Sequence, residues 1–538
     1  RDAWIALSLA SLVLLAGSTR MAVGVCGSYH DDAIYVSTAK ALADGDGYRL
    51  TGVPGTPRQT KYPILYPAIL PIVWTFFPSF PENLLVMQSI SLLAGAATVA
   101  LAYLYLVRRG YFSRPVAFAA GLCCAVSSGY LYFSTLTMAE PLFTLAIVVG
   151  LWGIDRQICR PSSSKTSQLG IGALAALPFL LRSIGAPLMP VTLWLLYRSG
   201  HRLRWYLAGM SAVAFPWICW SLMGRGVWDE SPVDGYYTDY FGCWSTTGLH
   251  LLGRVIALNS LAVLQGSTDL CLGRLASLVT GHFSDGIGAA LMSVPGLLVW
   301  LAIVRDLRTQ RLLPWIITAY LAMVLVWPWP LYRFLVPILP FMAVYLFSNI
   351  SDAMRRVLPS HGVRKVAVVG LFLIMAANLS LLVEYRGNLT RDGYPRFDLA
   401  GRAVQWSSYQ STIEWIQENS DEETVIASGL DSMLSLYANR QAYRPFIYRP
   451  DKLFYSERRE PLITTEQLIG ILRAYDTTFL VQCPLPGFSE EREFRDVVHA
   501  LHAEYPDWLR TVYQGTDTRF VIYELDPECA PSEAQTLP

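Results

Sequence analysis

Long apolar stretches recur along this 538-residue chain, and they constrain its fold more than any other feature of the sequence. A helix that spans a bilayer needs about 20 predominantly apolar residues. The stretches that reach or approach this length are Trp4–Val25, Leu84–Val107, Val116–Phe133, Leu142–Ile158, Trp205–Met223, Ile287–Val304, Leu312–Trp327, Phe334–Phe347 and Val363–Val383. Charged residues make up only 15% of the chain, whereas soluble domains carry about 25%. The sequence therefore predicts an α-helical polytopic membrane protein and argues against a soluble enzyme.

Basic residues indicate how these helices cross the membrane. Cytoplasmic loops carry the excess of Lys and Arg. The basic clusters between the apolar stretches are Arg108, Arg109 and Arg114; Arg156, Arg160 and Lys165; Arg198, Arg202 and Arg204; Arg305, Arg308 and Arg311; and Arg355, Arg356, Arg364 and Lys365. Placing all of them on one side gives a consistent alternation, in which the first stretch is an anchor. The net charge of only +1 gives no indication of nucleic-acid binding.

The stretch Leu169–Tyr197 lies between two basic clusters, so it must leave and return to the same side. It is too short for two full spans. Because it contains Pro178 and Pro187, we expect two half-helices with a tip at Arg182–Gly185. Irregular backbone at that depth is tolerated only inside protein or beside a water-filled cavity. Counting this hairpin as two, the chain is expected to cross about eleven times, with its C-terminal region outside.

Two regions follow from this topology. Residues 1–383 are expected to form a transmembrane module with outer loops at 26–83 and 224–286, and residues 384–538 an extracytoplasmic α/β domain. Periodicity predicts the elements of this domain. They are a helix at Thr412–Glu418 capped by Ser411, a strand at Thr424–Ala427, helices at Asp431–Tyr437 and Thr465–Ala474, a strand at Thr477–Gln482, a helix at Glu490–Ala503, and a hairpin of Thr511–Tyr513 with Arg519–Tyr523. The domain contains no catalytic motif, so we expect it to stabilise the protein or to bind an acceptor.

The strongest local signal for chemistry is a pair of carboxylates, Asp31 and Asp32, just past the first apolar stretch. They lie in the run Tyr-His-Asp-Asp-Ala-Ile-Tyr over 29–35. Ionisable residues at the membrane are costly and usually functional. Mutual repulsion and partial burial can raise the pKa of one carboxylate and so prepare a base. The alternative is that one of the two caps a helix over Ala33–Ala43.

A second signal is a proline-rich outer segment over 57–67 that contains two cations, Arg58 and Lys61. Cations on the outer side run against the positive-inside trend. They suit the binding of a lipid phosphate. Alternatively, Tyr62 and Tyr66 make the segment an interfacial anchor.

Three further polar residues, Glu140, Arg182 and Arg333, lie at the outer ends of apolar stretches. The topology places them on the same side as Asp31. A carboxylate pair with several cations suits transfer from an anionic leaving group. For each of the three alone, a structural ion pair is an equally good interpretation.

The order of these motifs resembles that of the C-type superfamily of membrane glycosyltransferases (GT-C), which includes protein O-mannosyltransferases and lipid A aminoarabinose transferases. The matching segments are Asp-Asp-Ala-Ile-Tyr at 31–35, Lys-Tyr-Pro-Ile-Leu-Tyr-Pro at 61–67, Met-Ala-Glu-Pro-Leu-Phe at 138–143, Leu-Arg-Ser-Ile-Gly at 181–185 and Tyr-Arg-Phe-Leu-Val-Pro at 332–337. The C-terminal α/β domain resembles those of some bacterial members. The ordered set, rather than any single motif, carries the resemblance.

The resemblance implies an inverting glycosyltransferase that moves a sugar from a polyprenyl-phosphate donor to a glycan, lipid or protein acceptor on the outer side. It implies that Asp31 is the general base, that Asp32 is a supporting carboxylate and that Lys61 binds the donor phosphate. Arg58 and Arg333 are expected to assist Lys61. Further cavity candidates are His30, Tyr66, Glu140 and Arg182. Many members pair Asp with Glu, so the division of labour between the two aspartates is open.

No cofactor is expected, and a metal requirement is open because members of the superfamily differ. The preferred location is a bacterial inner membrane, with an endoplasmic reticulum membrane as the alternative. Two other classes of function compete with the enzyme. A transporter often shows two homologous halves and helices broken at mid-membrane, and the sequence shows no internal repeat. A membrane scaffold or receptor with an outer binding domain would not need Asp31, Lys61 and Arg333 to converge on one face.

Overall fold

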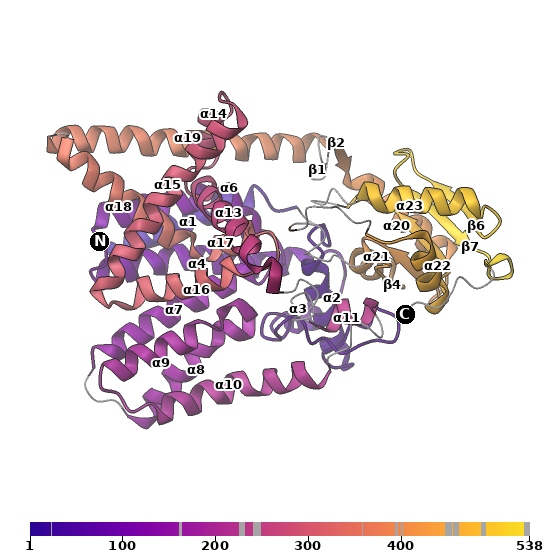
Figure 1. Ribbon diagram of the computed structural model, residues 1–538, viewed down its shortest axis with the longest axis horizontal. Coiled ribbons are helices and arrows are strands. Elements are labelled where there is room, and N and C mark those ends of the chain that lie inside the picture. Colours follow the sequence, from indigo (N-terminus) through magenta and orange to yellow (C-terminus); the bar gives the residue numbers. More distant parts are fainter. Residues whose placement is uncertain are drawn as a thin grey trace.

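The computed structural model describes residues 1–22, 24–160, 164–224, 232–239, 249–357, 359–392, 396–399, 402–446, 455, 462–485 and 491–531. Figure 1 shows an elongated molecule with a helical bundle at one end and a small α/β domain at the other. The short helices α2 (Asp31–Asp44), α3 (Pro71–Phe76) and α11 (Pro232–Thr238) lie between these two parts. We call these three helices and the loops beside them the middle layer.

Apolar helices build the bundle. They are α1 (Asp2–Ser18), α4 (Leu84–Arg108), α5 (Arg114–Val126), α6 (Ser128–Ser134), α7 (Glu140–Ile158), α8 (Lys165–Leu181), α9 (Leu188–Arg198), α10 (Arg204–Met223), α13 (Leu252–Leu272), α14 (Arg274–Thr280), α15 (Asp285–Asp306), α16 (Leu312–Leu325), α17 (Tyr332–Leu335), α18 (Leu339–Val357) and α19 (Ser360–Asp392). Among the described residues, 7 helices are long and apolar enough to cross a membrane, or 8 if a bent pair counts as one. Outward-facing side chains such as Leu301 and Phe372 are exposed, as a lipid-facing surface requires. The predicted polytopic helical fold is confirmed, whereas the number of eleven crossings is not.

The stretch predicted to form a hairpin does so as α8 and α9, with the short 3-10 helix η1 (Ser183–Gly185) between them. Pro178 lies inside α8, and its carbonyl oxygen accepts a hydrogen bond from the Arg182 N–H at 2.9 Å. The carbonyl oxygen of Leu180 accepts a hydrogen bond from the Leu65 N–H at 3.0 Å. The tip of the hairpin is therefore bonded to the outer segment that carries Lys61, which is a protein-lined setting for irregular backbone.

Two features of the bundle were not predicted from the sequence. The segment 224–286, predicted to be an outer loop, contains α13, which is among the candidate spans. Its polar residues hid this helix from the apolar pattern: Asn259 donates to the Trp327 carbonyl oxygen at 2.8 Å, and Asp269 accepts from the Tyr332 hydroxyl at 2.8 Å. The predicted span at 116–133 bends by 62° between α5 and α6.

Helix α2 begins with both aspartates in its first turn, where the helix dipole favours negative charge. The structure places His30, rather than an aspartate, at the N-cap position. The helix ends at Asp44, because Gly45 takes the left-handed conformation with φ of 89°. The position of Asp31 is thus fixed by a short buried helix that lies directly over the bundle.

The C-terminal domain is built on a mixed sheet with the strand order β4-β3-β5-β7-β6. Its strands are β3 (Val425–Ser428), β4 (Gln441–Tyr443), β5 (Phe479–Gln482), β6 (Leu509–Gln514) and β7 (Val521–Leu525), and its helices are α20 (Trp406–Asn419), α21 (Asp431–Ala438), α22 (Thr465–Ala474) and α23 (Glu491–Glu504). The strands β4, β3 and β5 are parallel, whereas β7 and β6 are antiparallel to their neighbours. A separate ribbon of β1 (Arg396–Leu399) and β2 (Arg402–Gln405) joins α19 to this domain.

Most predicted elements of this domain are confirmed, including the C-terminal hairpin of β6 and β7. The helix predicted from residue 412 instead begins at Trp406, so Ser411 lies inside α20 and donates to the Ser407 carbonyl oxygen at 3.0 Å. Strand β4 was not predicted, because three residues are too few to show an alternating pattern.

The C-terminal domain is docked on the middle layer through a shared apolar core. Ile34 of α2 and Val53 of the following loop belong to the same buried cluster as Met433 of α21. The Ala442 N–H donates to the Gly52 carbonyl oxygen at 2.8 Å. The domain therefore has a defined position relative to α2.

Helices α8 and α10 contact each other closely through glycine. A methyl group at Gly172 would meet the Tyr206 carbonyl oxygen well inside van der Waals contact, whereas Gly170 of the same helix faces open space. We predict that Gly172→Ala destabilises the protein by about 1–3 kcal/mol and that Gly170→Ala does not. Thermal unfolding of the two variants in the same detergent checks this. Equal unfolding midpoints would contradict close packing of the two helices.

Candidate active site

A cavity of about 260 Å³ lies where the bundle, the middle layer and the C-terminal domain meet. Its lining is mainly aromatic and apolar with a few charged groups, as in many small-molecule sites. The lining residues are Ser28, Tyr29, His30, Asp31, Tyr35, Lys61, Tyr62, Pro63, Leu181, Arg182, Ser183, Tyr236, Trp327, Trp329, Pro330, Arg333, Phe334 and Arg444. The residues of the sequence-based site that the structure brings into this lining are His30, Asp31, Lys61, Arg182 and Arg333.

Asp31 presents its carboxylate to the cavity between a hydroxyl donor and a cation. The Tyr62 hydroxyl donates to Oδ1 at 2.7 Å, and Nη1 of Arg333 lies 2.6 Å from Oδ2. Burial raises the pKa of Asp31, but Arg333 and Arg182 outweigh burial and bring it to about 2. Asp31 is therefore a carboxylate near neutral pH, and both of its oxygens can only accept hydrogen bonds.

Two arginines behind Asp31 share one buried counter-ion. Arg182 forms an ion pair with Oε1 of Glu140, and Nε of Arg333 lies 3.9 Å from the same oxygen. The Phe334 ring lies 5.2 Å from Arg182 and 5.1 Å from Arg333. Glu140 is buried and is not part of the lining. Its negative charge reduces the repulsion between the two neighbouring guanidinium groups at the cavity wall.

Lys61 reaches the cavity from the middle layer. Its Nζ donates to the Tyr236 carbonyl oxygen at 3.0 Å and lies 4.0 Å from the centre of the Tyr236 ring. The side-chain oxygen of Gln59 accepts from the backbone N–H groups of Lys61 and Tyr62, at 2.8 and 3.1 Å. The same short loop therefore positions a cation and the hydroxyl that binds Asp31.

Asp32 points into the loop that precedes α2. Its carboxylate accepts hydrogen bonds from the backbone N–H groups of Gly27 at 2.9 Å and Tyr29 at 3.3 Å, and the residue is 1% exposed. Burial raises the pKa of Asp32 to about 6, against the effect of the Gly27 amide. Asp32 is not among the lining residues. Its contacts suit a supporting carboxylate that shapes the loop carrying His30.

The structure does not bring Arg58 and Tyr66 into the lining of this cavity. The guanidinium of Arg58 lies 5.4 Å from the centre of the Trp220 ring. The Tyr66 hydroxyl lies 3.0 Å from the Ser91 hydroxyl in the bundle interior. Both residues belong to the predicted segment, but a sequence without regular periodicity does not reveal which of its side chains face the site.

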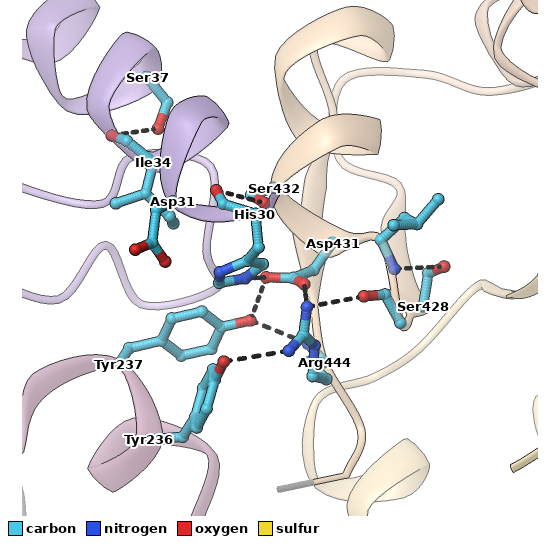
Figure 2. A network of polar contacts seen from close by, with 12 residues as sticks. His30, Asp31, Ile34, Ser37, Tyr236, Tyr237, Ser428, Asp431, Ser432 and Arg444 are labelled. Carbon is cyan, nitrogen blue, oxygen red and sulfur yellow. Dashed lines mark hydrogen bonds and ion pairs between the residues drawn. The ribbon is translucent and has the colours of Figure 1, made fainter. Parts of the chain in front are cut away.

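The residues that the C-terminal domain contributes to the cavity were not predicted from the sequence. Figure 2 shows Asp431 and Arg444 of this domain facing His30, Tyr236 and Tyr237. Arg444 lines the cavity, with Nη2 at 3.2 Å from Oδ1 of Asp431 and Nη1 donating to the Tyr236 hydroxyl at 3.0 Å. Oδ2 of Asp431 lies 3.3 Å from Nε2 of His30. A lone Asp and a lone Arg in a small domain form no motif, so only the docking of the domain could reveal them. Within the described ranges, no group of three or more His, Cys, Asp or Glu side chains is placed to hold a metal ion.

Comparison with known proteins identifies the fold. No protein-family model matches the chain, and no curated protein matches it by sequence. Among solved structures, ArnT from Cupriavidus metallidurans bound to undecaprenyl phosphate matches 98% of this chain and 99% of its own, with 11% identity and a TM-score of 0.52. The archaeal oligosaccharyltransferase AglB from Archaeoglobus fulgidus, in complex with an inhibitory peptide and a dolichol-phosphate, matches 98% of this chain and 75% of its own, with 11% identity and a TM-score of 0.56. The chain therefore has the GT-C fold that its motifs led us to expect.

The raised pKa of Asp32 predicts a pH dependence of stability. The folded state holds the Asp32 proton up to about pH 6, whereas the unfolded chain releases it near its ordinary value of about 4. This group therefore lowers the free energy of unfolding as pH rises between these values. We predict that the unfolding midpoint of Asp32→Asn, relative to that of the native protein, rises as pH increases from about 4 to about 6. A difference that is constant over this range, measured in one detergent and buffer series, would show that Asp32 titrates normally.

Proposed function

We propose that the protein is an inverting glycosyltransferase that moves a sugar from a polyprenyl-phosphate donor to an acceptor outside the cytoplasm. One observation carries the proposal: an ionised carboxylate, Asp31, lies with the cations Lys61, Arg182 and Arg333 at a single cavity. The GT-C fold, shared with proteins solved with undecaprenyl phosphate and with a dolichol-phosphate, supports it. A base and a set of cations are the two electrostatic requirements of glycosyl transfer from a phosphate.

In the proposed reaction the acceptor hydroxyl oxygen attacks the anomeric carbon of the donor sugar. The bond between that carbon and the phosphate oxygen breaks, and polyprenyl phosphate leaves with the electron pair. Asp31 takes the acceptor proton, so the carboxylate becomes neutral as the phosphate gains negative charge. Lys61, Arg182 and Arg333 stabilise that charge, because binding of the donor places its phosphate next to them before the bond breaks.

The low pKa of Asp31 has a consequence for this mechanism. A carboxyl group with a pKa of about 2 is a poor base near neutral pH. Its main partner is Arg333, which is also a candidate ligand of the donor phosphate. We propose that a bound phosphate draws Arg333 away from Asp31, which raises the pKa of the carboxyl group. Binding of the donor would then activate the base.

The competing classes of function account less well for this site. In a transporter of the inverted-repeat type, the polar groups lie near the middle of the membrane between two related halves. Here they lie at the cavity between the bundle and the docked α/β domain. A scaffold does not require an ionised carboxylate next to three cations at a cavity, whereas ionisable groups with shifted pKa values gather at functional sites. The location proposed is a bacterial inner membrane with the α/β domain on the extracytoplasmic side, and the acceptor is a glycan, a lipid or a protein.

Release of polyprenyl phosphate tests the proposed reaction. Purified protein is offered a panel of polyprenyl-phosphate sugars together with glycan, lipid and protein acceptors. The free lipid phosphate is measured for the native protein and for Asp31→Asn. We predict release by the native protein and a fall of about 10²–10⁴-fold in kcat for the variant, because the amide cannot take the acceptor proton. Release that persists in the variant would assign the base to another residue, and absence of release with every donor and acceptor offered would contradict the proposed function.

Lys61 and Arg58 form a matched pair of cations from one segment, of which only Lys61 lines the cavity. A hydrogen bond to a charged group contributes about 1.5–3 kcal/mol. We predict that Lys61→Gln raises the donor KM by about 10–100-fold, whereas Arg58→Gln has a much smaller effect. Donor titrations of both variants check this. An equal rise in donor KM for the two variants would mean that Arg58 also binds the phosphate, as the resemblance implied.

A further inference from the structure

The first turn of α21 in the C-terminal domain contacts the residue that directly precedes Asp31. Oδ2 of Asp431 lies 3.3 Å from Nε2 of His30, and the hydroxyl of Ser432 donates to the His30 carbonyl oxygen at 3.5 Å. Figure 2 shows both contacts, with His30 and Asp31 on α2 and the other two residues on the facing helix. Consecutive residues of α21 therefore bind the side chain and the backbone of His30.

The backbone at His30 needs such support. His30 is the N-cap of α2 and has φ of 65° and ψ of −55°, a conformation that L-residues rarely adopt. Residues in such sparsely populated regions cost about 1–3 kcal/mol and persist only where the surroundings hold them. Because Asp31 follows directly, the conformation of His30 determines where the carboxylate of Asp31 points.

Asp431 is itself held in place by several donors. It is fully buried, its Oδ2 accepts from the Tyr237 hydroxyl at 2.6 Å, and its Oδ1 lies 3.2 Å from Nη2 of Arg444. Burial opposes its ionisation, but His30 and Arg444 hold its pKa at about 2. Burial and Arg444 lower the pKa of His30, against the effect of Asp431.

The protonation states of His30 and Asp431 determine which of them donates the hydrogen bond. A neutral imidazole donates from only one nitrogen, and a carboxylate only accepts. Asp431 therefore favours the tautomer of His30 with its proton on Nε2, as well as one orientation of the ring.

We propose that Asp431 is a positioning residue of the transfer reaction. Through His30 it holds the start of α2, so the Asp31 carboxylate faces Tyr62 and Arg333 only when the C-terminal domain is docked. The inference rests on the proposed function, because it takes Asp31 as the base. It gives the C-terminal domain a part in catalysis beyond stabilisation or acceptor binding.

This role predicts a specific kinetic signature. The cations proposed to bind the donor phosphate are Lys61, Arg182 and Arg333. Asp431 pairs instead with Arg444, which lines the cavity but is not one of these three cations. Loss of the Asp431 contact should therefore leave the donor KM unchanged while kcat falls, since a misplacement of about 1 Å can cost about 100-fold in rate.

The test compares Asp431→Asn with Asp517→Asn, a matched change of an ion-paired aspartate in the same domain. Asp517 pairs with Arg519 at 2.7 Å in the β6–β7 turn, away from α2. Polyprenyl-phosphate release is measured on the full chain in detergent, with gel filtration and thermal unfolding as checks of folding. We expect kcat of Asp431→Asn to fall by about 10–100-fold with the donor KM within about twofold of native, and Asp517→Asn to behave as native. An unchanged kcat, or a loss confined to KM, would overturn the inference.

A second variant breaks the same contact from the other side. His30→Gln leaves the domain's carboxylate intact, so it tests the inference even if Asp431→Asn fails to fold. We expect the same fall in kcat, and no further fall when Asp431→Asn is added to His30→Gln, because residues that act through one contact are not additive. Losses that multiply would overturn the inference. If the native protein has no transfer activity, the proposed function itself is contradicted. If the native protein is active and the Asp431 variant is equally active, only the inference about Asp431 is contradicted.

Discussion

The ion pair between Asp31 and Arg333 connects parts of the chain that are far apart in the sequence. Asp31 begins a short helix of the middle layer, whereas Arg333 lies in α17 at the outer end of a long apolar segment. A buried ion pair gains little unless its charges are held in place and hydrogen-bonded. Tyr62 supplies the hydrogen bond, and Glu140 balances the positive charge of Arg333 and Arg182. The surrounding structure can be understood as the support for this group of charges.

Each supporting element has a visible physical cause. The hairpin of α8 and α9 brings Arg182 to its tip, and Pro178 lies just before the point where α8 ends. Asp32 stabilises the loop before α2, because its carboxylate accepts hydrogen bonds from two backbone N–H groups of that loop. The C-terminal domain contributes Arg444 to the lining of the cavity. The site is thus assembled from the bundle, the middle layer and the domain, and no single segment contains it.

Much of this arrangement could be predicted from the sequence, because apolar length and the distribution of basic residues report on membrane helices directly. The hairpin tip at Arg182 and the convergence of Asp31, Lys61 and Arg333 followed from those two signals together with the motifs. The helix α13 was missed, because buried polar residues such as Asn259 interrupt its apolar pattern. The roles of Asp31 and Asp32 could not be separated either, since only the backbone conformation shows that one faces the cavity and the other faces the loop.

The remaining residues of the site could not be predicted from the sequence, because they depend on contacts between the domains. Asp431 and Arg444 have no local pattern, and they reach the cavity only because α21 docks on α2. Arg58, in contrast, was predicted to belong to the site, but its side chain lies over Trp220 and is not part of the cavity lining. Sequence patterns therefore predicted the segments that carry the candidate residues, and the fold shows which of their side chains line the cavity.

The mechanism proposed here requires that the cavity beside Asp31 bind the phosphate of a polyprenyl donor. An experimental structure of the protein with a bound polyprenyl phosphate would show where this phosphate lies. We expect it within hydrogen-bonding distance of Arg333 and Lys61, with Arg333 moved away from the Asp31 carboxylate. A phosphate bound elsewhere on the protein, with the ion pair of Asp31 and Arg333 unchanged, would refute the mechanism.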